Sequence, residues 1–303
     1  MSSHQPALRL PAPEAPSRAD TLRLGIPKGR MYEGVVALLG GAGIRLAASE
    51  RGYRPRVSLE GVETKILKPQ NIVEMLDAGT RDLGFAGADW VAELGADVVE
   101  VLDTGLDRVR IVAAAPASIL VDGALPRRRL VVAAEFERLA RRWIGARALD
   151  ATFVRSYGAT EVFPPEDADC IVDVAASGAT LRANDLTIVD ELMTSSTRLF
   201  AGRRAWEHPA KRKRIEDLAL VLRSVLDARA RVMLELNVSA GRLDAVVAVL
   251  PCMRHPTISP LHGDGGFAVK AAVPRDRLAS LIPLLKDAGG ADIVISPIGQ
   301  VVP

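Results

Sequence analysis

The chain has 303 residues and a formal net charge of +2, with 49% apolar, 25% charged and only 4% aromatic residues. This is the composition of a globular protein with an aliphatic core, and at about 150 residues per domain the length predicts two or three domains. The charge balance argues against a nucleic-acid binder with a broad basic face. The sequence contains no run of about 18 apolar residues, the length that a membrane-spanning helix needs. Cys170 and Cys252 are too few for a disulfide scaffold or a thiolate zinc site, and they favour a reducing, cytoplasmic setting.

The first 20 residues contain four prolines and no apolar segment, so we expect a disordered tail there and no signal peptide. From residue 21 onward, short apolar runs alternate with segments of helical spacing, which predicts parallel sheets joined by right-handed crossovers. Asp89 is placed to cap the third helix. The expected strands are Leu22–Ile26, Thr64–Leu67, Asp82–Gly87, Val98–Leu102, Val109–Ala115, Arg129–Ala133, Ala151–Val154, Asp169–Val174 and Leu186–Ile188, and the expected helices are Met31–Leu39, Asn71–Ala78, Trp90–Leu94, Phe136–Ile144 and Thr180–Asn184.

Two successive α/β patterns predict two lobes around a cleft. The first lobe comprises residues 21–115 and 192–228, and the second comprises residues 116–191. A long amphipathic helix with apolar positions from Ile215 to Leu226 ends the first lobe. Residues 229–303 change to the order β-α-β-β-α-β, which is typical of a ferredoxin-like domain. Its expected elements are Arg231–Leu236, Leu243–Leu250, Thr257–Ser259, Gly266–Val273, Arg277–Ala288 and Asp292–Pro297.

The most informative segment runs from Cys170 to Leu181, where a β-branched strand leads through a loop of small residues into a helix. Such a loop can present backbone N–H groups to a phosphate monoester, and Gly178 would let the backbone approach it closely. Ser177 and Thr180 add hydroxyl donors, and Asp173 at the strand end could accept hydrogen bonds from two sugar hydroxyls. Taken alone, the segment favours an ordinary strand-to-helix turn capped by serine over a phosphate site.

A second segment, Ile26-Pro27-Lys28-Gly29-Arg30, places two cations beside a glycine where a strand enters a helix. Lys28 offers a point charge and Arg30 a planar fork, so together they suit a polyphosphate. Arg51 is a third candidate cation. Basic residues at helix starts are often merely solvated, which is the competing interpretation here.

Two further segments are ambiguous by themselves. The turn Gly158-Ala159-Thr160-Glu161 can pack against a base or ribose, and it can equally be a capping motif. The basic run Lys211-Arg212-Lys213-Arg214 suggests a nucleic-acid patch, but four charges at a helix start usually form a solvated face.

Together and in this order, these segments resemble the ATP phosphoribosyltransferase family, in the long form that carries a C-terminal regulatory domain. The resemblance covers about residues 22 to 300. Two positions depart from the family pattern: Ala86 stands where threonine is usual, and Ala175-Ala176 replace more polar loop residues. The matching segments are Ile26–Arg30, Gly84–Trp90, Gly158–Glu161, Ile171–Asn184 and Pro256–Leu261.

The resemblance implies an α/β fold with a two-lobed core like that of periplasmic binding proteins and a C-terminal ferredoxin-like (ACT-like) α+β domain. It implies transfer of the phosphoribosyl group of phosphoribosyl pyrophosphate to N1 of ATP, the first step of histidine biosynthesis. Mg²⁺ would enter on the substrate's pyrophosphate, because the sequence shows no dense carboxylate cluster for a dedicated metal cage. Cytoplasmic homo-oligomers, as dimers and hexamers, are the family's expected assemblies.

The resemblance also assigns residues. The 5-phosphate and ribose would be held by the segment from Asp173 to Thr180, the pyrophosphate or ATP phosphates by Lys28, Gly29, Arg30 and Arg51, and the nucleotide by Gly87, Asp89, Gly158 and Glu161. The C-terminal domain would bind L-histidine as an inhibitor. Asn237, His255 and Thr257 are its candidate contacts, and the loop that carries the 5-phosphate comprises Ala175, Ala176, Ser177, Gly178, Ala179 and Thr180.

Two other functions fit parts of the sequence. A cytosolic two-lobed sensor of small ligands would share the lobes, but it would have little use for the loop after Asp173. A phosphoribosyltransferase for another base would share that loop, but the Ile26–Arg30 segment and the C-terminal domain weigh against it. Pyrophosphate release with ATP, compared with other base acceptors, would separate these alternatives.

Overall fold

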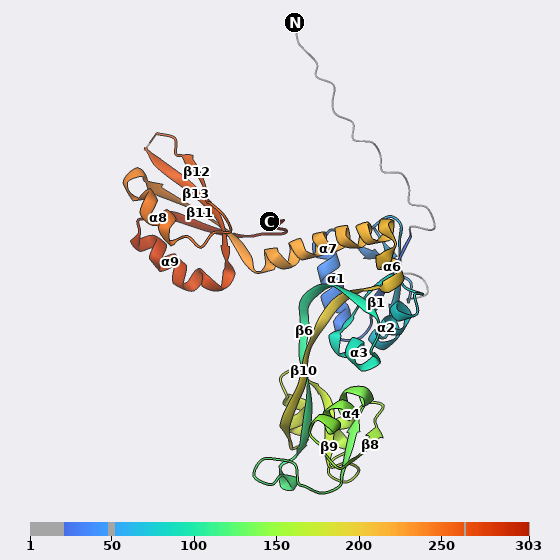
Figure 1. Cartoon of the computed structure of the whole chain (residues 1–303). Coiled ribbons are helices and arrows are strands. Elements are labelled where there is room, and N and C mark those ends of the chain that lie inside the picture. Colours follow the sequence, from blue (N-terminus) through green and yellow to red (C-terminus); the bar gives the residue numbers. More distant parts are fainter. Residues whose placement is uncertain (1–20, 48–51, 264, 303) are drawn as a thin grey trace. The chain divides into compact units, whose positions relative to one another are not determined.

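The computed structural model describes residues 21–47, 52–263 and 265–302 (Figure 1). The tail predicted for residues 1–20 and the candidate cation Arg51 lie outside the described residues. The chain divides into two compact units. The first unit ends at residue 32, resumes at 45 and runs to 215, and the second contains residues 33–44 and the chain from 216 onward.

The first unit is built on an eight-stranded sheet in the order β4-β1-β5-β10-β6-β9-β7-β8. Parallel pairs form its two sides, as predicted, but β10 runs antiparallel to β5 and β6, and β6 runs antiparallel to β9. The expectation of purely parallel sheets is therefore wrong at the centre of the sheet. The strands are β1 (Leu22–Pro27), β4 (Val62–Leu67), β5 (Leu83–Gly87), β6 (Val98–Pro116), β7 (Leu130–Ala134), β8 (Ala151–Arg155), β9 (Cys170–Ala175) and β10 (Leu186–Gly202).

The central strands β6 and β10 are much longer than the sequence suggested, with 19 and 17 residues (Figure 1). They pair from Leu186 opposite Pro116 to Gly202 opposite Val98, through several register shifts. The two runs expected on either side of residues 103–108 therefore form one strand. The reason is a bulged stretch in which Gly105 and Asp107 adopt positive φ (64° and 49°), which interrupts the alternation of apolar residues without ending the ladder.

Helices on the sheet bury apolar side chains in separate clusters. Helix α2 (Pro69–Asp77) buries Ile72, Val73 and Leu76 with Phe200 of β10, while α4 (Glu137–Ala146) buries Leu139 and Trp143 against β6, β7 and β9. The remaining short elements of this unit are α3 (Ala88–Leu94), α5 (Ala179–Ala183), α6 (Arg203–Glu207), the 3-10 turns η2 (Ala117–Ile119) and η3 (Thr160–Val162), and an unpredicted ribbon of β2 (Leu46–Ala47) and β3 (Arg56–Val57).

A buried carboxylate joins two of these helices. Glu93 of α3 accepts hydrogen bonds from the backbone N–H groups of Arg138 (2.9 Å) and Leu139 (3.0 Å) in the first turn of α4. These donors have no partner within their own helix, so Glu93 takes the role of a capping residue from a distant part of the chain. This contact fixes α3 against α4.

The basic run before residue 215 is solvated only in part: Arg212 and Lys213 are exposed, as expected, whereas Lys211 is mostly buried. The Lys211 side chain is only 13% exposed, and its Nζ lies 2.9 Å from Oδ1 of the buried Asp82, which Arg23 also binds. Arg212 stacks over the Trp206 ring at 4.7 Å, and Arg214 donates to the Glu60 carbonyl (2.7 Å). These side chains tie the start of α7 (Pro209–Arg229) to the sheet.

The second unit contains most of α1 (Met31–Gly41), most of α7 and the C-terminal sheet. A Cβ on Gly41 would come within 2.8 Å of Val225, so glycine lets α1 and α7 pack closely. The six C-terminal elements occur in the predicted order, and their four strands form an antiparallel sheet in the order β12-β13-β11-β14. The six elements are β11 (Arg231–Ser239), α8 (Leu243–Val249), β12 (Thr257–Pro260), β13 (Gly266–Pro274), α9 (Leu278–Asp287) and β14 (Ala291–Pro297). Two 3-10 turns, η4 (Ala240–Arg242) and η5 (Arg275–Arg277), precede the two helices.

Every second residue of β11 is buried in the core of this C-terminal sheet. Val232, Leu234, Leu236 and Val238 are buried and pack against Val246 of α8 and Leu281 and Leu285 of α9. The alternate residues of β11 therefore lie on the other face of the sheet. Within the described residues, no helix is long and apolar enough to cross a membrane.

Candidate active site

The turn between β1 and α1 presents the two predicted cations to solvent. Lys28 and Arg30 are exposed, and Gly29 between them adopts a φ of +78°, a conformation that glycine takes without strain. The Lys28 N–H donates to the Leu67 carbonyl (2.8 Å), which anchors the turn to β4. The turn therefore holds its backbone in the sheet and leaves both charged side chains outside.

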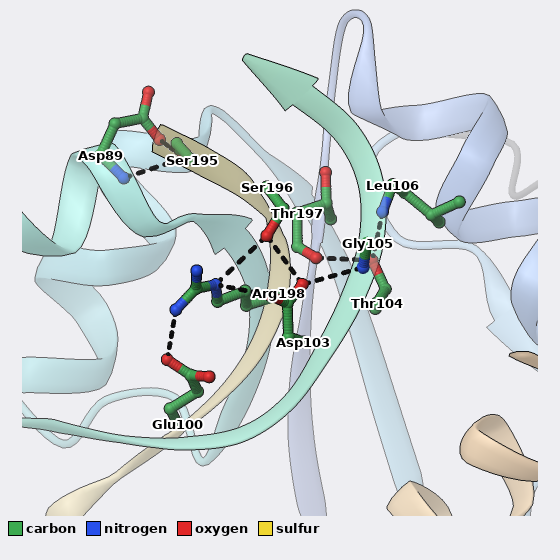
Figure 2. Close-up of polar contacts among 10 residues, drawn as sticks. All are labelled: Asp89, Glu100, Asp103, Thr104, Gly105, Leu106, Ser195, Ser196, Thr197 and Arg198. Atoms are coloured by element: carbon green, nitrogen blue, oxygen red, sulfur yellow. Dashed lines mark hydrogen bonds and ion pairs between the residues drawn. The ribbon is translucent and has the colours of Figure 1, made fainter. Parts of the chain in front are cut away.

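Asp89 is buried and is held by Ser195 of β10. The Ser195 hydroxyl donates to Asp89 Oδ1 (2.8 Å), and the Asp89 backbone N–H donates to the same hydroxyl (3.1 Å) (Figure 2). Burial raises the pKa of Asp89, while the hydrogen bond from Ser195 and the nearby charge of Arg30 oppose that rise. Arg30 and Asp89, which the sequence placed in one site on separate segments, thus interact electrostatically.

The expectation that Asp89 caps α3 is wrong, because Gly87 holds the cap position and Asp89 is the second helical residue. A Cβ on Gly87 would lie 2.0 Å from Asp89 Oδ1. Glycine is therefore required at 87 so that the carboxylate can fold back over the backbone and reach Ser195.

Residues that the sequence did not single out form a polar network where β6 bulges against β10. Asp103 accepts from the Ser196 hydroxyl (2.7 Å) and the Gly105 N–H (2.8 Å), and Arg198 pairs with Glu100 (2.7 Å) (Figure 2). The Thr197 hydroxyl donates to the Asp107 carboxylate (2.7 Å). The one sequence signal was the run of four hydroxyl residues from 194 to 197 within β10.

The predicted phosphoribosyl loop follows β9. Asp173 is half-buried near the end of this strand, and its Oδ1 accepts the Val174 N–H (2.7 Å). Burial, together with the negative charges of Glu161 and Glu135, raises the pKa of Asp173 to about 6 against the hydrogen bond from Val174. Asp173 and Glu161, predicted from separate segments, therefore lie close enough to interact.

The loop itself is mostly open to solvent. Ala175 is buried in the sheet and Gly178 is buried with a φ of +73°, whereas the remaining small residues are exposed. The Ser177 carbonyl accepts from Arg182 (3.0 Å), and its hydroxyl accepts from the Ala179 N–H (3.4 Å). The exposed loop residues are Ala176, Ser177, Ala179 and Thr180.

The turn containing Gly158 leads into η3, whose start has no side-chain cap hydrogen bond, so the capping interpretation is wrong here. Gly158 is exposed with a φ of +116°, and Ala159 also has positive φ (49°). Thr160 is buried, and its hydroxyl lies 2.7 Å from that of Ser156. This closes the turn and leaves Glu161 half-buried beside Asp173.

The three candidate histidine contacts in the C-terminal domain lie on different elements. Asn237 of β11 donates to Asp292 (3.0 Å), whereas Thr257 lies on β12 opposite Lys270, with β13 between β11 and β12. His255 is exposed just before β12. The structure does not bring Asn237 into direct contact with Thr257.

Comparison with known proteins identifies two family models on the chain. The family described as ATP phosphoribosyltransferase matches residues 68–224, and the family described as the HisG C-terminal domain matches residues 228–300. Among solved structures, the ATP phosphoribosyl transferase (HisG:HisZ) complex from Thermotoga maritima has a chain with a TM-score of 0.61 at 23% identity, covering 68% of this chain and 98% of that one. This likeness concerns the fold.

Curated relatives match along nearly the whole chain. The ATP phosphoribosyltransferases of Pelotomaculum thermopropionicum and Desulforudis audaxviator are 36% and 37% identical over 287 residues, which is 93% of this chain and 99% of each relative. The chain therefore belongs to the long form of the ATP phosphoribosyltransferase family, the transferases that catalyse the first step of histidine biosynthesis.

Proposed function

We propose that the chemistry takes place in a cavity of about 360 Å³ between β6, β10 and the loop after β9. The observation that carries this proposal is that one cavity is lined both by Ala176 of the predicted phosphoribosyl loop and by Ser195, which holds Asp89. It thus connects the two groups of residues that the sequence assigned to one reaction. The continuous sheet supports a two-lobed core like that of periplasmic binding proteins, with β6 and β10 crossing between the lobes.

In the proposed reaction the lone pair of adenine N1 attacks C1 of the ribose. The bond from C1 to the pyrophosphate oxygen breaks, pyrophosphate leaves with the electron pair, and the configuration at C1 inverts. No strong base is needed to form this bond, because N1 is already a nucleophile. The protein's task is to position two polyanions and to stabilise the departing charge.

Each predicted residue has a role in this scheme. Asp173 accepts hydrogen bonds from the ribose hydroxyls, and the exposed backbone of residues 176–180 binds the 5-phosphate. Lys28 and Arg30 bind phosphates, with Gly29 shaping their turn. Asp89 and Glu161, with the backbone at Gly87 and Gly158, contact the nucleotide.

The family's use of a divalent metal fits the donor set if the ion arrives on the substrate. Among the described residues no group of three or more His, Cys, Asp or Glu side chains is placed to hold a metal ion. We propose Mg²⁺ bound by the pyrophosphate of phosphoribosyl pyrophosphate, where it neutralises charge on the leaving group. Asp173 and Glu161 would then orient the ribose and nucleotide beside it.

The C-terminal domain is proposed to be ferredoxin-like and to bind L-histidine as an inhibitor. The β-α-β-β-α-β order and the antiparallel sheet support the first point. Asn237, His255 and Thr257 remain the candidate contacts, and their separation within one chain favours a site completed by another copy in a cytoplasmic homo-oligomer. Inhibition then requires two global states with different affinities for histidine.

A single assay tests the proposal. Phosphoribosyl-ATP formation is followed by absorbance and pyrophosphate release by a coupled reaction, with ATP and with other base acceptors, with and without histidine. We expect turnover with ATP, dependence on Mg²⁺ and loss of rate with histidine. Turnover with another base in preference to ATP, or binding of substrates without release of pyrophosphate, would contradict it.

A further inference from the structure

The cavity between β6 and β10 carries more positive charge than the residues predicted from the sequence account for. Arg108, Arg110 and Arg198 line it, and Asp103 is the one acidic residue among its lining residues. Three guanidinium groups around one cavity repel one another unless anions separate them. Their partners therefore decide which of these cations is available to a ligand.

Two of the three arginines are already paired. Arg198 binds Glu100 (2.7 Å) and Asp103 (3.4 Å), and Arg110 pairs with Glu191 (3.3 Å) across the strands. Arg108 is exposed and makes no hydrogen bond or ion pair with any residue that the structure describes, although its charge helps to lower the pKa of Asp103. It is the cation of this cavity that is left for a ligand.

The backbone before Arg108 is held in a shape that a regular strand would not adopt. Asp107 has a φ of +49°, and its carboxylate is fixed by the Thr197 hydroxyl (2.7 Å). The Thr104 hydroxyl donates to the Thr197 carbonyl (2.5 Å), and the Gly105 N–H donates to Asp103 (2.8 Å). These contacts hold the bulge, so the backbone that carries Arg108 to the lining of the cavity is fixed by the fold.

The paired arginine Arg110 lies directly beside the predicted phosphoribosyl loop. It stands opposite Ala175 of β9 on one side and Thr194 of β10 on the other. An anion bound by Arg108 in this cavity would therefore lie next to the loop proposed to hold the 5-phosphate, and next to the Ser195–Asp89 pair.

We propose that this cavity is a polyphosphate subsite in which Arg108 binds substrate phosphate directly, with Arg110 adding positive charge to its lining. The inference rests on the proposed function. A polyphosphate matches the charge and the forked geometry of guanidinium groups. Two sources supply that chemistry, the triphosphate of ATP and the pyrophosphate of phosphoribosyl pyrophosphate.

The test compares Arg108→Gln with Arg108→Lys and with Arg127→Gln, an exposed arginine outside the cavity. KM and kcat are measured with each substrate varied while the other is saturating. We expect Arg108→Gln to raise one KM about tenfold or more, the size of a lost charge-assisted hydrogen bond. The lysine variant keeps the charge but loses the fork, so its KM should lie between those of the unaltered chain and Arg108→Gln. A raised KM for ATP assigns the triphosphate, and a raised KM for phosphoribosyl pyrophosphate assigns the pyrophosphate.

Direct binding separates this inference from the proposed function. Calorimetry with inorganic pyrophosphate is expected to show binding to the unaltered chain and to Arg127→Gln, and weakened binding to Arg108→Gln, whether or not turnover occurs. Unchanged KM, kcat and pyrophosphate binding in Arg108→Gln would overturn the inference while leaving the reaction intact. Equal losses in Arg108→Gln and Arg127→Gln would also overturn it, because they would reflect net charge alone.

Discussion

Ser195 and Asp89 lie 106 positions apart in the sequence and form a reciprocal pair, in which the serine hydroxyl donates to the carboxylate at 2.8 Å and accepts the aspartate's backbone N–H at 3.1 Å. Both residues are buried. The pair joins the start of α3 to the middle of β10. It therefore helps to fix a buried carboxylate that also accepts hydrogen bonds from the backbone at the start of α3.

Ser195→Ala should reveal what this pair contributes. Losing the hydroxyl leaves the buried carboxylate with backbone N–H donors alone, so we expect the free energy of unfolding to fall by about 1–3 kcal/mol. The pKa of Asp89, already raised by burial, should rise further, because the hydrogen bond that favoured the charged form is gone. Chemical denaturation measures the first effect and the pH profile of turnover the second.

Ser118→Ala is the matched control, since Ser118 is exposed in a 3-10 turn. It should change neither stability nor the pH profile. If Ser195→Ala leaves stability and the pH profile unchanged, as Ser118→Ala should, the pair of Ser195 and Asp89 does not stabilise the fold.

Asp173→Asn should keep the fold and lower turnover about a hundredfold, the usual cost of removing one transition-state contact. The carboxylate can accept from two hydroxyls, whereas the amide presents one accepting oxygen. Steady-state kinetics at saturating substrate measure the loss. Near-normal turnover would show that the ribose is held elsewhere.

The raised pKa of Asp173 gives this prediction a pH signature. Because its pKa is about 6 in the folded chain and lower in the unfolded chain, the ionised carboxylate lowers the free energy of unfolding above pH 6. That penalty disappears as pH falls and the group is protonated in both states. We expect kcat/KM of the unaltered chain to fall below pH 6. In thermal unfolding at pH 8, Asp173→Asn should be at least as stable as the unaltered chain.

Replacing both Lys28 and Arg30 with Ala should raise the apparent KM values and slow turnover together, by about a hundredfold or more in kcat/KM. Ground-state phosphates and the departing pyrophosphate would share these two cations. Both side chains are exposed, so folding should be unaffected by circular dichroism. An unchanged kcat would restrict them to ground-state binding.

Asp82→Asn should act on stability alone. Asp82 is 4% exposed and binds both Arg23 and Lys211, so its loss leaves two cations without their partner and should cost about 3 kcal/mol or more. Burial acts to raise the pKa of Asp82, but the ion pairs outweigh it and the pKa lies below its ordinary value. The stabilisation is therefore present above about pH 4 and is lost as pH falls through the folded-state pKa.

Acid titration of unfolding in the unaltered chain and in Asp82→Asn checks this sign. The two should converge at low pH and differ most near neutrality. A constant difference across the range would mean that the charge of Asp82 is irrelevant.

Truncation after Arg229 should separate catalysis from regulation. It removes the C-terminal sheet and leaves the eight-stranded sheet with the cavity and the loop after Asp173. We expect a folded chain that forms phosphoribosyl-ATP, at reduced rate, and no longer responds to histidine. Asn237→Ala in the full-length chain is the companion variant, with weakened inhibition and unchanged turnover. A folded truncation still inhibited by histidine would place the effector site outside the C-terminal domain.

The sequence was most informative where structure is local. The loop after Asp173, the turn at Lys28–Arg30 and all six C-terminal elements were placed from residue types and spacing, because strand alternation, helical periodicity and glycine turns are written into neighbouring residues. Membership of the phosphoribosyltransferase family followed from the same short segments occurring together.

The centre of the molecule was decided by tertiary structure. The antiparallel course of β10, the union of two runs into β6, the capping of α4 by Glu93 and the pairing of Ser195 with Asp89 all depend on partners from 45 to more than 100 residues away. No local pattern encodes them, because a strand's direction and a buried charge's partner are set by whichever distant element packs against it. The sequence thus determined the chemical groups, and the long strands β6 and β10 determined that Ser195 and the loop after β9 lie at one cavity.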